Sequence, residues 1–429
     1  MPQFLFFSYF GPSRRSDHRV VEIRLDFDPG ELPKLPQQVT DARQLLIDAG
    51  ILSGEMSYFD EPHPDDRMDW YLTLLAQTAL LFQRRNGHRV EFFSVSSKPD
   101  KNQCTVLVQH EHSKVGVEAV KLAIEVFTGK LKSLIKAYCS FSEFAQECLL
   151  PLETETIIKY ARRRNIPFLQ ADREPLSGRL DTGFRVRRNG LLILGHGRSS
   201  RILDGTFCVD LANDYLKALL RNPGQRRALL RQLSIPTAPA EPGGSADSGQ
   251  YFLLVINKQV TAVEQLDDGS RQMVGDVHES LLDMCQAVSQ QISFAPVAIN
   301  LQALNISQSL AHTGGVVEDI DLAPDLGQLL TGCEDHSELL GKAANDLIDW
   351  LFPDQAASRI PIIALTGTNG KTTTSRMISH IVHTSGRKPG LVCTDGIFLN
   401  GRQLTNTDAS SFLGHTRVLG SKTVDFAVL

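Results

Sequence analysis

The chain has 429 residues, 42% of them hydrophobic and 22% charged, a balance typical of a soluble globular protein with two or three domains. Its formal net charge of −5 lacks the basic excess that nucleic acids or anionic membranes attract, so we expect neither kind of partner. The seven cysteines are scattered without metal-ligand spacing and the apolar start is too short for a signal peptide, so we expect a cytoplasmic protein.

Residues 1–150 alternate between strand and helix patterns. Residues 20–27 alternate apolar and polar side chains as a half-buried strand does, and residues 104–109 predict a second strand. Residues 70–82 and 115–127 carry apolar residues at helical spacing. We therefore expect a compact N-terminal α+β domain, in which no group of titratable residues forms a site.

The middle of the chain shows further elements around a linker. A helix over 153–166 is followed by an apolar strand at 191–194 and a glycine turn at 195–198. The next helix is expected to end before Pro236, because proline lacks the N–H that a helix needs. Residues 237–250 are rich in Pro, Gly, Ser and Ala, a composition typical of a flexible linker.

A strand, a glycine-bracketed turn and a helix follow one another near the end of the chain. Residues 360–365 (IPIIAL) are apolar and partly β-branched, and residues 366–374 (TGTNGKTTT) lead into a segment with helical spacing. Gly367 and Gly370 leave room for backbone N–H groups to converge on a polyphosphate, whose charge the helix N-terminus also favours. The arrangement predicts a phosphate-binding loop.

Side chains of this loop complete an ATP site in outline. Lys371 would place a cation on the β- and γ-phosphates, and the hydroxyl of Thr372 is positioned to bind Mg²⁺. The general pattern has glycine where this chain has Leu365, and an ordinary strand-to-helix turn is the alternative, which the Gly-Lys-Thr order disfavours. We expect Thr372 to be the metal ligand and assign no catalytic residue. The predicted nucleotide contacts are Gly367, Thr368, Asn369, Gly370, Lys371, Thr372 and Thr373.

Residues 366–374 resemble the ATP loop of the Mur ligases, which activate a carboxylate as an acyl phosphate and join it to an amine. Residues 394–402 (TDGIFLNGR) narrow the resemblance to the cyanophycin synthetase family, which makes a polymer with an aspartate backbone and arginine branches. The resemblance implies a multidomain α/β and α+β chain. Its parts would be an N-terminal α+β domain at 1–151, a reduced ATP-grasp-like domain at 152–357 and an incomplete Mur-ligase-type P-loop α/β domain at 358–429.

The ATP-grasp-like part departs from that family at several points. The linker at 237–250 stands where the family has a lid subdomain that closes over the triphosphate. Asn300 stands where a metal-binding Asp is expected, and Asp319 and Asp321 take the places of a Glu and an Asn. Glu318, Asp319 and Asp321 form either a residual magnesium site or an acidic strand end that faces water. We favour the second, because a neutral amide is a poor ligand for a hard cation.

The last part of the chain is expected to be incomplete. Residues 358–429 show three strands and about two helices, fewer than the five or six strands of a typical doubly wound sheet. In the family, the metal ligand, adenine contacts and amino-acid pocket lie further on.

Two functions follow from the resemblance. One is an ATP-dependent acid–amino-acid ligase that forms amide bonds with ATP and Mg²⁺, although we do not expect this chain to be self-sufficient in catalysis. The other is a pseudoenzyme: a non-catalytic structural or regulatory partner that assembles with a full-length cyanophycin synthetase or its polymer. The altered ATP-grasp residues favour the second, and in both cases we expect an oligomer.

Overall fold

The computed structural model forms two compact units, Met1–Leu149 and Leu150–Leu429. The residues that the structure describes are 4–11, 13, 15–26, 29–52, 67–98, 103–131, 133–170, 191–237, 249–265, 271–309, 312, 315–333, 336–353 and 357–429.

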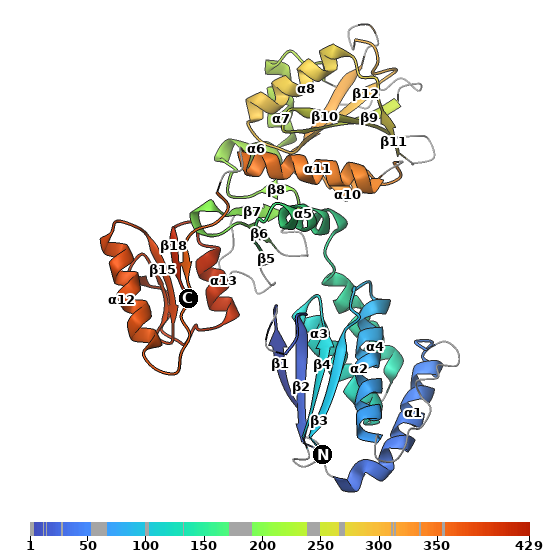
Figure 1. Cartoon of the computed structure of the whole chain (residues 1–429). Helices are drawn as coiled ribbons and strands as arrows, with labels where there is room; N and C mark the ends of the chain where they lie inside the picture. Colours follow the sequence, from blue (N-terminus) through green and yellow to red (C-terminus); the bar gives the residue numbers. More distant parts are fainter. Residues whose placement is uncertain are drawn as a thin grey trace. The chain divides into compact units, whose positions relative to one another are not determined.

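The first unit contains a four-stranded antiparallel sheet in the order β1-β2-β4-β3 (Figure 1). Its strands are β1 (Phe4–Tyr9), β2 (Val20–Asp26), β3 (Phe93–Lys98) and β4 (Gln103–Gln109). Its helices are α1 (Leu35–Asp48), α2 (Arg67–Arg85), α3 (Ser113–Phe127) and α4 (Leu134–Glu147), with a 3₁₀ turn at Pro29–Lys34.

Alternation along the strands builds the core of this unit. Ile23 and Leu25 of β2 are buried, and so are Val106 and Val108 of β4, the strand paired with it. Helices α2 and α3 contact these strands and each other. Because apolar residues recur at helical spacing in α3, its buried side chains lie along one side, and its charged residues remain on the other.

His110 follows β4 directly and is only 2% exposed. Gly116 of α3 lies against it, and a Cβ added there would stand 2.6 Å from the Cβ of His110, so this crossing of chain segments requires glycine. Burial, and after it the positive charge of Arg19, lowers the pKa of His110 to about 4.

This buried imidazole makes the stability of the first unit dependent on pH. Because the folded pKa of about 4 lies below the ordinary 6.5, the unfolded chain takes up the proton first as the pH falls, and stability is lost between these two values. Between about pH 7 and 5, we expect the free energy of unfolding of His110→Asn to fall by about 1–2 kcal/mol less than that of the wild type. Urea unfolding of the full chain, followed by circular dichroism, measures the difference.

The matched control is His380→Asn, since His380 is exposed on its helix. This variant should keep the pH dependence of the wild type. If His110→Asn also kept it, His110 would not be buried in its neutral form.

The second unit begins with two antiparallel sheets. The smaller has the order β5-β6-β7-β8, and the larger has the order β11-β10-β9-β12-β13. The strands are β5 (Phe168–Gln170), β6 (Leu192–Leu194), β7 (Arg201–Asp204), β8 (Phe207–Cys208), β9 (Gly249–Ile256), β10 (Gln259–Gln265), β11 (Arg271–Val274), β12 (Val297–Ala303) and β13 (Val316–Asp321). The helices are α5 (Leu152–Arg163), α6 (Asp214–Arg221), α7 (Pro223–Gln232), α8 (Glu279–Ile292), α10 (Leu326–Leu329) and α11 (His336–Leu351).

One apolar core joins these two sheets to α5, α8 and α11. Strand β12 lies between β9 and β13, and five of its seven residues are buried. Asn300 and Gln302 are its two half-buried positions. Asn300 is therefore a polar side chain near the centre of the larger sheet.

The third sheet of this unit is mixed, with the order β14-β18-β15-β16-β17. Strands β14 (Ile362–Ile363), β18 (Phe426–Val428) and β15 (Pro389–Cys393) are parallel, whereas β16 (Gly396–Leu399) and β17 (Arg402–Gln403) are antiparallel. Helices α12 (Lys371–Thr384) and α13 (Phe412–Leu419) lie on either side of it (Figure 1).

The expected number of three strands in this last part is wrong, because β16 and β17 add a hairpin. Asn400 and Gly401 form its turn with φ angles of 50° and 81°, in the left-handed region. This is the backbone of a type I′ turn, which Asn-Gly favours. The dipeptide was the signal in the sequence that could have predicted the hairpin.

The glycine turn after β6 connects the smallest sheet to the mixed one. The N–H of His196 donates to the carbonyl of Ser358 at 2.8 Å, and the N–H of Arg198 donates to the carbonyl of Val424 at 2.7 Å. Gly197 has a φ of 56°, and a Cβ there would collide with the carbonyl of Val424. Glycine is required here by both the backbone conformation and the close approach of the two segments.

The structure confirms a multidomain chain of mixed α/β class, with three antiparallel sheets and one mixed sheet among the described residues. In that same part of the chain, no helix is long and apolar enough to cross a membrane.

Candidate functional site

The predicted phosphate loop connects β14 to α12 at one end of the mixed sheet. Hydrogen bonds to β18 hold the strand side of the loop: the N–H of Leu429 donates to Ile363 and the N–H of Leu365 donates to Leu429, at 2.9 and 2.8 Å. Gly370 is the N-cap of α12, with a φ of 78° and no side chain to occupy the helix end. The first N–H groups of α12 therefore point out of the loop without a capping side chain, which is the arrangement that binds anions.

Lys371 folds back over this loop. Its ammonium donates to the carbonyl of Gly367 at 2.6 Å and lies 3.4 Å from that of Thr368. The lysine is exposed, so a stronger acceptor such as a phosphate oxygen can replace these carbonyls without uncovering a buried charge.

Two hydroxyl groups meet beside the loop. The Oγ1 of Thr372 lies 2.9 Å from the Oγ1 of Thr394, which follows β15. The loop pattern in the sequence predicts the position of Thr372, and the structure places Thr394 beside it. This pair lies at the carboxyl ends of the parallel strands, where open α/β folds bind ligands.

An ion pair lies next to the hydroxyls. Arg376 of α12 contacts the carboxylate of Asp395 at 3.0 Å, and its guanidinium lies 5.1 Å from the ring centre of Phe398. The backbone carbonyl of Asp395 accepts a hydrogen bond from Gln403 at 2.9 Å. Arg376 was missed in the sequence, although it lies one helical turn after Thr372 and so on the same side of α12.

The loop fits a triphosphate with Mg²⁺. A glycine in the left-handed region starts the helix, a lysine lies at its first position, and two threonine hydroxyls adjoin it. These are backbone donors, a cation and hard oxygen ligands, which match the chemical needs of phosphate and magnesium.

The second candidate site lies on the larger antiparallel sheet. Asn300 pairs in register with Phe252 on one side and with Asp319 on the other, and Ala298 pairs with Asp321. A cavity of about 290 Å³ opens here, lined by Arg226, Asn300, Asp319, Ile320, Asp321 and Leu322. The structure thus brings together three of the residues that the sequence pattern singled out.

The side chain of Arg226, in α7, is bound to the carboxylate of Asp319, which a metal ion at this site would need. Its Nε and Nη2 donate to the two oxygens of Asp319 at 2.7 and 2.6 Å, a bidentate contact, and its Nη1 donates to the carbonyl of Leu219 at 2.8 Å. Asp321 uses one oxygen to accept from the N–H of Ala323 at 2.9 Å. Asp319 is therefore paired with a guanidinium, while its side chain remains 36% exposed.

These residues do not fit a magnesium ion. A hard cation needs several free oxygen ligands, whereas both oxygens of Asp319 are bonded and Asn300 is a neutral amide. No three His, Cys, Asp or Glu side chains form a metal-binding group anywhere in the described part of the chain.

Sequence patterns gave no sign of Arg226, because it lies in a helix of ordinary basic composition about 90 positions before its partner. Most of the predicted linker, 238–248, and Gly314 lie outside the described residues.

Part of this chain is similar to proteins of known name. Cyanophycin synthetases of Crocosphaera subtropica and Synechocystis sp. are 31% and 32% identical to it over 154 residues, 36% of this chain and 17% of each relative. The UDP-N-acetylmuramoyl-L-alanyl-D-glutamate–2,6-diaminopimelate ligase of Aquifex aeolicus is 41% identical over 61 residues, 14% of this chain and 12% of that protein. No protein-family model matches. The relation to cyanophycin synthetase is partial and distant, that to the Mur ligase is weaker, and the chain spans under a fifth of these relatives.

Removing Arg226 should uncover the role of its ion pair. Arg226→Met keeps the aliphatic stem but leaves Asp319 without its bidentate partner, and we expect it to destabilise the second unit by about 1–3 kcal/mol. Asp319→Asn should act in the same direction. Because the two residues contact each other, the double variant should lose clearly less free energy of unfolding than the two single variants together. Urea unfolding measures these losses.

Arg231→Met is the control, because Arg231 is exposed near the end of the same helix. It should change stability by less than about 0.5 kcal/mol. Strictly additive effects of Arg226→Met and Asp319→Asn would contradict the pairing.

Proposed function

We propose that the chain binds ATP with Mg²⁺ through its phosphate loop. The observation that carries this proposal is the start of α12, where Gly370 in the left-handed region, Lys371 and Thr372 follow one another and Thr394 adds a second hydroxyl. The nucleotide contacts would come from Gly367 to Thr373. Lys371 would bind the terminal phosphates, and Thr372 would hold the metal, which spreads the negative charge of the phosphates.

In a cyanophycin synthetase or Mur-ligase type of reaction, bound ATP would serve ATP-dependent amide-bond formation. This chain contributes a charged loop that orients the triphosphate, but we propose that it is not self-sufficient in catalysis. The reason is the second site, where Arg226 engages Asp319 and Asn300 replaces a carboxylate. A grasp-type centre with these residues has no place for the magnesium ions that phosphoryl transfer needs.

A second candidate function is a non-catalytic structural or regulatory partner of an active cyanophycin synthetase or of its polymer. The same ion pair favours it, because Arg226 and Asp319 connect α7 to β13, so that a position matched to a metal ligand in the resembled family holds two elements together here. In this function, ATP binding would stabilise the last part of the chain without turnover.

Lys371 tests the nucleotide site directly. Lys371→Ala removes the cation, and we expect it to weaken binding of a fluorescent ATP analogue in the presence of Mg²⁺ about tenfold or more, which corresponds to about 1.4 kcal/mol. Lys388→Ala is the control, since Lys388 is exposed beyond the end of α12. Equal affinities of the two variants would contradict the proposed site.

Turnover separates the two functions. We expect no release of ADP above background when the purified chain is given ATP, Mg²⁺, aspartate, arginine and a polymer primer, because the grasp-type centre does not fit magnesium and the phosphate loop has no assigned catalytic residue. ADP release that depends on these substrates would refute the non-catalytic proposal. Co-purification with a full-length synthetase would support the partner function.

A further inference from the structure

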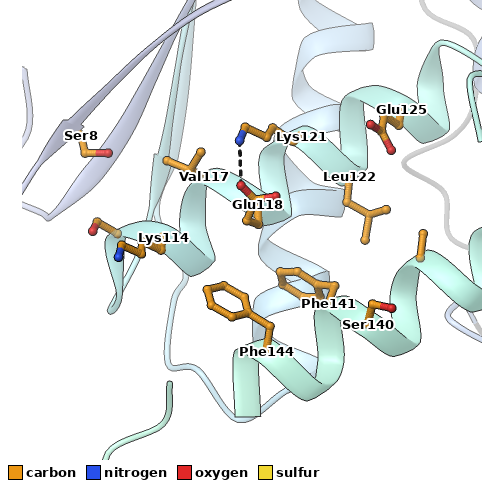
Figure 2. A pocket seen from close by; sticks show the side chains of 12 residues that line it. Ser8, Lys114, Val117, Glu118, Lys121, Leu122, Glu125, Ser140, Phe141 and Phe144 are labelled. Atoms are coloured by element: carbon orange, nitrogen blue, oxygen red, sulfur yellow. Dashed lines mark hydrogen bonds and ion pairs between the residues drawn. The ribbon is translucent and has the colours of Figure 1, made fainter. Parts of the chain in front are cut away.

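Four charged residues of α3 alternate in sign along one exposed stripe. Lys114, Glu118, Lys121 and Glu125 follow each other at intervals of one helical turn, so their side chains lie in a row (Figure 2). The side chains of Glu118 and Lys121 are each 48% exposed and form an ion pair at 2.7 Å. We call these four residues the charged stripe.

An open cavity of about 670 Å³ lies beside the charged stripe, between α3 and α4. Figure 2 shows the side chains of both helices around it, with Val117 and Leu122 from α3 and Phe141 and Phe144 from α4. Val117 and Phe144 are only partly buried. A row of charges next to an accessible apolar floor is the layout of a helix-binding surface, in which the apolar part supplies affinity and the charges set orientation.

The signs of the charged stripe make it complementary to itself in one orientation. When a second α3 lies antiparallel to the first, with a twofold axis between positions 119 and 120, Lys114 faces Glu125 of the partner subunit. Glu118 then faces Lys121 of the partner subunit. In a parallel arrangement, each charge would instead face its own copy, which is repulsive.

We propose that this surface joins two copies of the chain as a symmetric dimer. A twofold axis uses one patch twice, so a single self-complementary stripe is sufficient for a closed pair. Exposed ion pairs add little affinity individually. Because salt screens exposed charges, the dimer should weaken as the salt concentration rises. The proposal is independent of nucleotide binding, because the charged stripe lies in the first unit.

Charge exchange tests the proposal by sedimentation equilibrium of the full chain. The wild type should be a dimer whose dissociation constant rises with salt. Glu118→Lys would place like charges together twice, across the axis, and should raise the dissociation constant about tenfold or more. The double variant E118K/K121E restores opposite charges across the axis, so it should dimerise again to within about threefold of the wild type.

Two further variants make the test specific to this stripe. K114E/K121E gives an entirely acidic stripe and E118K/E125K an entirely basic one. Each should be monomeric alone, whereas their mixture should form a one-to-one dimer. Circular dichroism confirms folding, and Lys121→Glu replaces Glu118→Lys if that variant does not fold. A wild type that stays monomeric at about 100 μM, a dimer unaffected by Glu118→Lys, or a mixture that does not associate would each overturn the proposal.

Discussion

The bidentate contact between Arg226 and Asp319 is the interaction on which the middle of this protein depends. The carboxylate of Asp319 lies on β13, at the edge of the larger sheet, and either a metal ion or a side chain can pair with it. Here the chain supplies its own cation from α7, and the guanidinium satisfies both oxygens at 2.7 and 2.6 Å. A carboxylate bonded in this way has few oxygen lone pairs left for a magnesium ion.

The phosphate loop obeys a different constraint. The ammonium of Lys371 is exposed and bonds to two loop carbonyls, and no carboxylate among the described residues pairs with it. Arg376, in contrast, is paired with Asp395, so the acidic residue beside the hydroxyls is already neutralised. The loop therefore keeps a free cation for an anionic ligand, while the neighbouring carboxylate is engaged by the helix that follows.

The two candidate sites differ in how their charges are used: Lys371 is exposed at the loop, whereas Arg226 and Asp319 are paired with each other. Similarity to cyanophycin synthetases extends over 36% of this chain, so the function of the remainder is inferred from its own geometry. The first unit adds the charged stripe of α3, whose four side chains alternate in sign.

Local patterns in the sequence were sufficient wherever the structure depends on neighbouring residues. The strands at 20–27 and 104–109, the helix at 115–127 and the loop before Lys371 follow from alternation, helical spacing and glycine placement, which act over a few positions. The hairpin at Asn400-Gly401 also depends on neighbouring residues, because an Asn-Gly dipeptide by itself favours the type I′ turn.

Contacts between distant segments were decided only by the tertiary structure. Arg226 meets Asp319 across 93 positions and the turn at Gly197 meets Val424, and no local pattern encodes either approach. The sequence could not show that Asp319 has a cationic partner, because the pairing of a charge depends on which helix the fold places beside it. Sequence determined which residues can do chemistry here, and the packing of α7 on the sheet decided that one of them does not.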